Sequence, residues 1–236
     1  MLEYKITTLK SQELEPDGRI THTITVNDRA ATRATIFRRI TAAGFHAIER
    51  SNWAAHKVKT DLEPDWNYTM IAIHHAGRGY ICNPGSLQMK EIQGLHQSDD
   101  WGDIGYHYGI DCSGFIFEGR DIRYKGNHLG LFNTGAIGIV LLENLTTVEE
   151  GEDFIADVRV TAKEKLGYDT TQTIPSQQIS ALYALLASLQ SVFNITTLGG
   201  HREYPHQEKR ICPGNIAMEL IDELRANTQL LPPPAL

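Results

Sequence analysis

The chain has 236 residues, with 29 acidic and 22 basic side chains and a formal net charge of −7 at pH 7. This charge excludes bulk electrostatic binding to nucleic acid or to anionic lipid, and we expect neither partner. With 41% hydrophobic and 22% charged residues, the composition is that of a globular protein with one sizeable core. Apolar stretches are too short for a membrane span or a secretory signal, so we expect synthesis in the cytoplasm and no integral membrane association.

The first 46 residues contain two regular patterns but no chemical motif. Residues 21–26 alternate like an edge strand, and residues 30–43 have helical spacing. We therefore interpret residues 1–46 as an N-terminal extension.

From residue 69 onward, strand and helix signals alternate along the chain. Strands are predicted at 69–74, 136–142 and 196–200, and a hairpin is predicted from 106–111 and 114–118. Helices are predicted at 86–97 with Ser86 as N-cap, 155–166, 179–193 and 215–225. Helices that cover a central sheet indicate the α/β class. Residues 229–236 are a proline-rich tail that cannot continue the last helix.

The three cysteines, Cys82, Cys112 and Cys212, are scattered and odd in number. Their arrangement predicts no disulfide framework and at least one thiol that is free or holds a ligand.

Two histidines and one cysteine stand where metal ligands are expected. His74 ends a predicted strand, His201 follows a glycine pair at the end of another, and Cys212 lies in the sequence CPG. Two imidazoles and a thiolate suit zinc, and three protein ligands leave a fourth position for water, as in catalytic zinc sites. A chain with ten histidines yields such a triplet by chance, so composition alone does not establish the site.

Four sequence blocks carry a family resemblance: NWAAHKVK with YTMIAIHHAG, IQGLHQSDDWGDIGYHYGIDCSGFIFEGR, NTGAIGIVLLEN, and LGGHREYPHQEKRICPG. In order and spacing they resemble the zinc-dependent N-acetylmuramoyl-L-alanine amidases that share a fold with peptidoglycan recognition proteins. The resemblance covers residues 47–228 and implies one amidase domain, in which helices flank a central mixed β-sheet.

The resemblance implies roles for five residues of the site. It identifies His74, His201 and Cys212 as zinc ligands and Tyr106 as the tyrosine beside the zinc water. Arg210 stands where phage and bacterial relatives often carry a lysine. Tyr106 and Arg210 are therefore expected to stabilise the oxyanion of the tetrahedral intermediate.

Other residues near the motifs are expected to be structural. By alternation along their strands, His75 and His107 should point away from the site. One bacterial branch has a glutamate base after I-G-I, but Val140 occupies that place here, and we do not assign Glu143 as the base. His206 lies in the expanded loop between the last two ligands and is not expected to be one.

Substrate binding is expected at the segment that departs most from the animal relatives. The residues that we assign to substrate binding are Arg123, Lys125, Asn127 and His128. Either cation can pair with a carboxylate of the stem peptide, although exposed charged loops are most often only solvated. Animal relatives have a short-range disulfide after the I-H-H block. Cys82 lacks a partner at that spacing, and Cys112 is expected to be inert.

The interpretation is a zinc hydrolase that cleaves the amide between N-acetylmuramic acid and L-alanine in peptidoglycan. The alternatives are a non-catalytic peptidoglycan-binding module, a cytoplasmic amidase that recycles muropeptides, and a cysteine hydrolase that uses Cys212 with His201. As a lytic enzyme or interbacterial toxin, the protein would reach the wall through a holin or a secretion machine. In the toxin case an immunity protein is a possible partner.

Overall fold

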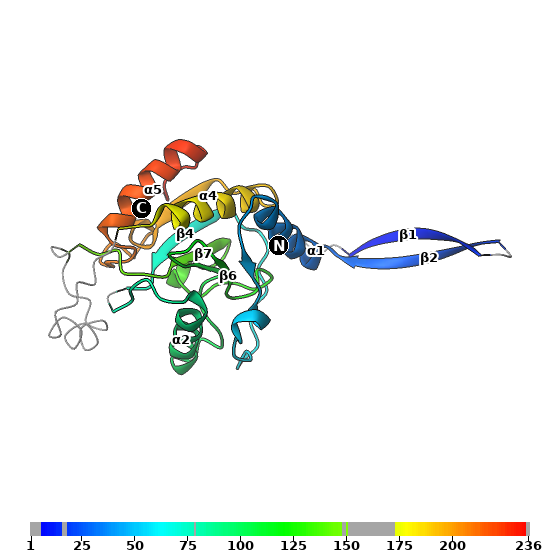
Figure 1. Ribbon diagram of the computed structural model, residues 1–236, viewed down its shortest axis with the longest axis horizontal. Helices are drawn as coiled ribbons and strands as arrows, with labels where there is room; N and C mark the ends of the chain where they lie inside the picture. Colours follow the sequence, from blue (N-terminus) through cyan, green and yellow to red (C-terminus); the bar gives the residue numbers. More distant parts are fainter. Residues whose placement is uncertain (1–5, 16–17, 78, 148–149, 151–172, 235–236) are drawn as a thin grey trace.

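The computed structural model describes residues 6–15, 18–77, 79–147, 150 and 173–234, with side chains from Arg29 onward. Its centre is a six-stranded mixed sheet (Figure 1). The strands are β3 (Ala47–Ile48), β4 (Met70–His75), β5 (Tyr108–Ile110), β6 (Ile116–Glu118), β7 (Ala136–Leu141) and β8 (Thr197–Gly200), in the order β3-β6-β5-β7-β4-β8. Only β5 and β6 pair antiparallel, and the other neighbours are parallel. The α/β class predicted from the sequence is confirmed.

Helices cover both faces of this sheet (Figure 1). One face carries α1 (Asp28–Ala42), α4 (Ser176–Gln190) and α5 (Asn215–Thr228), and the other carries α2 (Gly85–Ser98). Ile71 and Ile73 of β4 belong to the same hydrophobic cluster as Leu186 of α4. Val140 of β7 belongs instead to the cluster of Met89 on α2. Strands that are buried on both faces need apolar residues at every position, which explains the continuous apolar run of β7.

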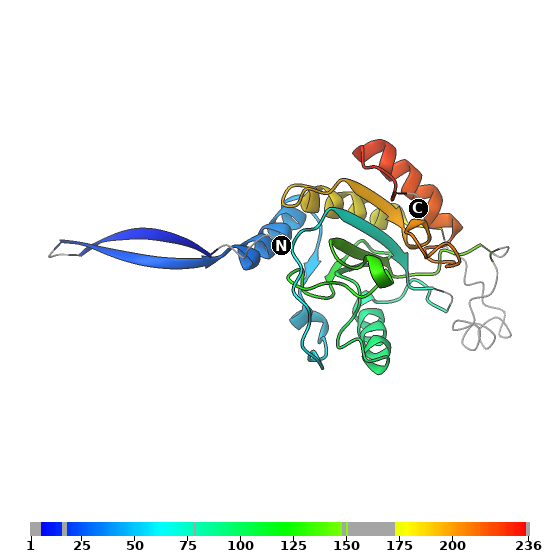
Figure 2. The ribbon, with the colours of Figure 1, turned by 180° about the vertical axis from the view of Figure 1, so that it is seen from behind.

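The N-terminal segment forms a hairpin followed by a packed helix. Strands β1 (Ile6–Glu15) and β2 (Gly18–Asn27) pair antiparallel, and the hairpin extends away from the central sheet (Figure 2). The strand predicted at 21–26 lies within β2, and the helix predicted at 30–43 is α1. Ile36 and Ile40 of α1 are fully buried in the main core, so this helix packs on the sheet.

The other predicted elements agree with the structure except at one helix start. The predicted hairpin is β5 with β6, and the helices predicted at 86–97, 179–193 and 215–225 are α2, α4 and α5. The predicted N-cap Ser86 is wrong, because α2 begins at Gly85 after Pro84 without a side-chain cap from its own segment. The carboxylate of Asp111 accepts a hydrogen bond from the Gly85 backbone instead. The helix predicted at 155–166 lies outside the described residues.

A disulfide joins two elements that are distant in sequence. Cys82, in the loop between β4 and α2, is bonded to Cys112 in the β5–β6 turn, 30 residues further on. The prediction of no disulfide was wrong for these two scattered cysteines, because the hairpin folds against the start of α2 and brings them together, although Cys82 indeed has no partner at the short spacing of the animal relatives. Cys212 stays outside the disulfide, in agreement with the prediction that at least one thiol is free or holds a ligand.

The proline-rich tail returns to the sheet edge after α5 ends at Thr228. Leu231 forms a parallel bridge with Thr197 of β8, and its backbone N–H donates to the Thr196 carbonyl at 2.9 Å. None of the helices in the described ranges combines the length and hydropathy that crossing a membrane requires.

Candidate metal centre

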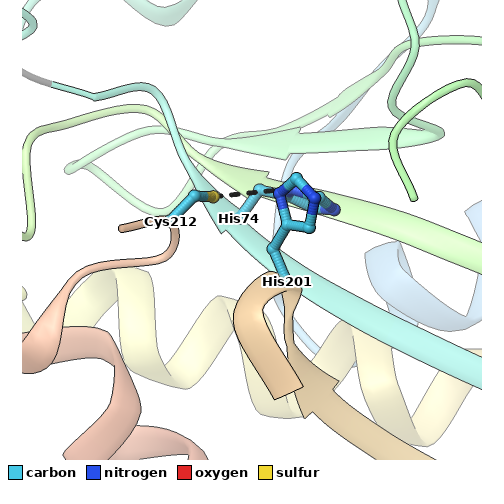
Figure 3. Close-up of side chains that lie close together, drawn as sticks. All are labelled: His74, His201 and Cys212. Atoms are coloured by element: carbon cyan, nitrogen blue, oxygen red, sulfur yellow. Dashed lines mark hydrogen bonds between the residues drawn. The ribbon is translucent and has the colours of Figure 1, made fainter. Parts of the chain in front are cut away.

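The three residues that the sequence singles out as ligands meet at one end of the sheet (Figure 3). His74 is the penultimate residue of β4, and His201 begins the short 3-10 helix η3 (His201–Glu203) directly after β8. Because β4 and β8 are parallel neighbours, their carboxyl ends lie at the same edge. Cys212 precedes α5, and its carbonyl accepts a hydrogen bond from the Arg202 backbone at 3.1 Å, which holds the cysteine loop beside η3.

The donor atoms are close enough to share one ion. The ligand atoms of His74, His201 and Cys212 all lie within 4.8 Å of one another. His74 Nδ1 is 3.5 Å from Cys212 Sγ. A tetrahedral zinc with Zn–N and Zn–S bonds of about 2.05 and 2.3 Å requires an N···S distance of about 3.6 Å. Both the donor types and their spacing therefore fit zinc.

Hydrogen bonds on the far side of the His74 ring fix which nitrogen faces this centre. His128 Nε2 is 3.3 Å from the Ala136 carbonyl, which can only accept, so His128 Nε2 carries the proton. His128 Nδ1 is then an acceptor, and it lies 3.1 Å from His74 Nε2. His74 therefore donates from Nε2 and presents the lone pair of Nδ1 to Cys212.

His201 is held in the same way by the loop that precedes Cys212. Its Nε2 donates to the side-chain oxygen of Gln207 at 3.1 Å, which leaves Nδ1 for a ligand. Histidines that bind metals almost always donate their other N–H to a fixed acceptor, which sets the tautomer and the ring orientation. Both histidines of this centre have such an acceptor.

The backbone makes room for His128 behind His74. A Cβ atom added at Gly138 of β7 would lie 2.6 Å from Cδ2 of His128, so only glycine fits beneath this ring. The side chain of Asn133 accepts hydrogen bonds from the backbones of His128 and Leu129, both at 2.7 Å, and so fixes the turn that carries the ring. The glycine of the I-G-I pattern in β7 thus has a packing reason.

The histidines of this centre are neutral at pH 7. Burial lowers the pKa of His74 and of His128 well below the usual value, and the neighbouring histidines lower it further. Burial also lowers the pKa of His201 to about 4, and the charge of Arg210 acts in the same direction. Neutral imidazoles keep the lone pairs that a metal ion needs.

This geometry agrees with a family assignment of the sequence. A family model described as N-acetylmuramoyl-L-alanine amidase (Amidase_2) matches residues 64–215. The chain belongs to this amidase family. The match contains β4, β8 and all three candidate ligands.

The similarity to relatives in sequence and in structure extends over most of the chain. Peptidoglycan-recognition protein SC2 of Drosophila simulans is 29% identical over 189 residues, which are 77% of this chain and 87% of that protein. The solved endolysin N-acetylmuramoyl-L-alanine amidase LysCS of Clostridium intestinale is 25% identical with a TM-score of 0.57, and the likeness covers 78% of this chain and 96% of that one. Peptidoglycan recognition protein LE, solved with tracheal cytotoxin, a monomeric diaminopimelic acid-type peptidoglycan, has a TM-score of 0.60 at 19% identity, over 78% and 95% of the two chains.

Tyr106 and Arg210 each lie near one histidine of the centre. The Tyr106 ring is 4.8 Å from the His74 ring, centroid to centroid. Burial raises the pKa of Tyr106 far above its usual value, and Cys212 and Tyr80 add to the effect, so the phenol stays a hydrogen-bond donor. Arg210 is exposed in the loop beside His201. The oxyanion roles assigned from the amidase resemblance stay predictions.

The four residues assigned to substrate binding do not lie together on one open surface. Arg123 forms a bidentate pair with Asp121, at 2.6 Å for the shorter contact, and Lys125 pairs with Glu63. Asn127 is partly buried, and its backbone N–H donates to Gly105 at 3.0 Å.

His128, the fourth of these residues, is only 6% exposed and lies behind His74. Sequence reasoning missed this contact and also missed Gln207, because neither residue belongs to a ligand motif.

The expected structural histidines have structural roles. His75 Nδ1 accepts a hydrogen bond from the Leu145 backbone at 3.1 Å, on the face of β4 opposite to His74. His107 Nδ1 accepts from the Gly138 backbone at 3.0 Å. His206 is exposed and stacks on Phe132, with ring centroids 6.2 Å apart. These contacts agree with structural roles, and the expectation that the three histidines do not bind the metal stays a prediction.

Proposed function

We propose that the protein is a zinc-dependent N-acetylmuramoyl-L-alanine amidase that hydrolyses the amide between N-acetylmuramic acid and L-alanine of peptidoglycan. The observation that carries this proposal is the His74, His201 and Cys212 triplet, whose donor atoms lie within 4.8 Å of one another. Family membership supports the amidase reaction, and the recognition protein solved with a peptidoglycan fragment supports the substrate class.

In this proposal His74, His201 and Cys212 would hold a zinc ion, which would supply an acidic water and polarise the scissile carbonyl when bound. His128 and Gln207 keep both imidazoles in the tautomer with a free Nδ1. The phenol of Tyr106 donates to the oxygen that becomes negative in the tetrahedral intermediate, and the Arg210 cation near His201 adds positive charge. The bond to the L-alanine nitrogen breaks, the water oxygen stays on the lactyl carboxyl group of muramic acid, and one proton of that water passes to the leaving amine of the stem peptide.

A cysteine hydrolase has one observation in its favour, because Cys212 Sγ is 3.5 Å from His74 Nδ1, close enough for a thiol–imidazole hydrogen bond. That mechanism needs an imidazole that accepts the thiol proton and then donates it to the leaving group. The deeply lowered pKa of His74 opposes this proton transfer. The same atoms serve a metal ion without any protonation of His74, which favours the zinc mechanism.

The deciding experiment is mass spectrometry of diaminopimelate-type peptidoglycan after digestion by the protein, with and without a zinc chelator. We expect the digest to contain free stem peptides and intact glycan strands. A chelator should abolish the release of stem peptides, and added zinc should restore it. Activity that survives the chelator and is abolished by thiol alkylation would indicate the cysteine mechanism. Binding without cleavage by zinc-loaded, folded protein would indicate a binding module.

We also propose that the enzyme acts on the cell wall as a lytic enzyme or as an antibacterial toxin, after release by a holin or delivery by a secretion machine. In the toxin case, an immunity protein that covers the metal centre is the expected partner. A pull-down with the zinc-loaded protein, in competition with peptidoglycan fragments, tests for such a partner. A cytoplasmic role in muropeptide recycling instead predicts activity on soluble fragments and none on intact sacculi.

A further inference from the structure

A second cluster of metal-binding side chains joins the loop that follows β4 to the β5–β6 turn and the end of β7. It consists of Cys82, Cys112 and Glu143, whose ligand atoms also lie within 4.8 Å of one another. In the structure the two cysteines form a disulfide. The amidase proposal does not use any of these three residues, so the role of the cluster is a separate question.

Glu143 has no structural explanation in this position. Its side chain is fully buried two residues beyond the end of β7. Oε2 is 3.7 Å from Cys82 Sγ and 3.6 Å from Cys112 Sγ. Within the described part of the chain, Oε1 has no hydrogen-bond partner. A buried carboxyl group without a cation or sufficient donors is costly to fold, so a ligand that completes its bonding is expected.

The spacing of these atoms is that of a tetrahedral zinc site. With Zn–S and Zn–O bonds of about 2.3 and 2.1 Å, the sulfur and oxygen ligands are about 3.6 Å apart. Both observed S···O distances match this value. Only the two sulfur atoms would have to separate, and this occurs when the disulfide is reduced.

We propose that Cys82, Cys112 and Glu143 form a second metal site, which takes a thiophilic divalent cation such as Zn²⁺ when the disulfide is reduced. A dithiol reductant supplies two electrons and two protons, so it becomes a disulfide while Cys82 and Cys112 become thiols. Metal binding then releases both thiol protons, and any proton on Glu143, and leaves two thiolates and one carboxylate as ligands. Cys82 and Cys112 thus either form the disulfide or bind the metal, but not both at once.

The surroundings of the cluster allow exchange with solvent. A surface cavity of about 610 Å³ has Cys82 and Cys112 in its wall, together with Asn83, Ser86 and Phe115. Through this cavity a reductant reaches the sulfur atoms, and water can fill the fourth position on the metal. In either state the loop after β4 stays linked to the β5–β6 turn, in reducing and in oxidising surroundings alike.

The test is a titration of the full chain with Co²⁺. The thiolate-to-cobalt charge-transfer absorption reports how much metal the cysteines bind. We expect one ion per oxidised chain and two per chain after reduction with a dithiol and removal of the reductant. Cys212→Ser removes the thiol of the site formed with His74 and His201. In this variant, thiolate absorption that appears only after reduction therefore belongs to Cys82 and Cys112. Cys82→Ser abolishes that absorption.

Glu143→Gln keeps both cysteines and tests the carboxylate. Outer-shell partners alone are worth about 10–100-fold in metal affinity, so the loss of a direct ligand weakens the second site at least about tenfold. Circular dichroism checks that the variant is folded. Reduced wild-type protein that takes up one ion only, or a Glu143→Gln variant with unchanged affinity, would overturn the proposal. Because the readout is metal uptake, failure of the amidase assay leaves this test intact.

Discussion

His74 Nε2 and His128 Nδ1 are 3.1 Å apart, and the Ala136 carbonyl on the far side of His128 determines the direction of this hydrogen bond. Through this contact His128, a buried loop residue, positions the candidate metal ligand His74. It also explains why Gly138 is required in β7, since any Cβ there would collide with the His128 ring.

Replacement of His128 by Ala therefore weakens zinc binding about 10–100-fold, because the His74 ring loses the acceptor that fixes its tautomer. The measurement is zinc affinity by competition with a chelating dye. His206→Ala is the matched control, since His206 is exposed in the nearby loop, and its affinity should equal that of the wild type. If both variants bind zinc equally well, His128 does not position His74.

Tyr106→Phe tests the oxyanion role without disturbing the metal. We expect kcat to fall on the order of 10²–10³-fold, the usual loss for one oxyanion donor, while zinc affinity stays unchanged. Release of stem peptides from peptidoglycan gives the rate, and dye competition gives the affinity. A variant with full activity would leave Tyr106 a packing residue against His74.

Arg210→Ala is expected to lower kcat less, by about tenfold, because solvent and salt screen its exposed charge. Arg210→Lys should recover part of this loss, since it retains the charge but not the planar guanidinium. The comparison is made at low and at high salt. An effect on kcat that is independent of salt would contradict the electrostatic role.

The metal-free protein should lose stability in mild acid. His96 and His107 each accept a backbone hydrogen bond through Nδ1, from Gly105 and Gly138, and burial lowers the pKa of each to about 4. The unfolded chain titrates near 6.5, so it binds more protons than the folded chain between these values. The contribution of each such histidine to the free energy of unfolding is fully present above about pH 6.5. It decreases toward pH 4 by about 1.4 kcal/mol per pH unit.

Urea unfolding of the metal-free protein at a series of pH values measures this slope. His107→Asn keeps an acceptor atom near the place of Nδ1 but cannot be protonated, so its slope should be smaller by about 1.4 kcal/mol per pH unit. Equal slopes for the two proteins would show that His107 does not titrate during unfolding.

Much of the fold could be predicted because its signals are local. Residues near in sequence determine the buried run of β7 and the amphipathic helices. They also determine that His74 and His201 stand at the carboxyl ends of strands. The ligand triplet was identified by motif resemblance, and the parallel pairing of β4 with β8 explains why it assembles.

The features that escaped prediction depend on contacts between distant segments. Cys82 and Cys112 are 30 residues apart, and the N-terminus of α2 is capped by Asp111 from a different element. His128 and His74 are 54 residues apart. No spacing rule links such residues, because the intervening chain determines whether they meet.

The N-terminal helix α1 offers a last test, because one buried ion pair fastens it to the sheet. Arg33 donates from Nε and Nη2 to the two carboxylate oxygens of Glu118, at 2.5 and 2.6 Å, and Glu118 is only 3% exposed. Glu118 is the last residue of β6, and its carbonyl accepts from the Trp53 indole at 2.8 Å. Loss of the guanidinium would leave a buried carboxylate without its main partner.

Arg33→Ala is therefore expected to lower the free energy of unfolding by about 3 kcal/mol, at the low end for a buried pair because Arg33 is partly exposed. Arg38→Ala on the exposed side of α1 is the control and should change stability by less than about 0.5 kcal/mol. Adding Glu118→Gln to Arg33→Ala should restore part of the loss, since it removes the stranded charge. If the double variant is no more stable than Arg33→Ala alone, packing of the arginine stem, and not its charge, holds α1 on the sheet.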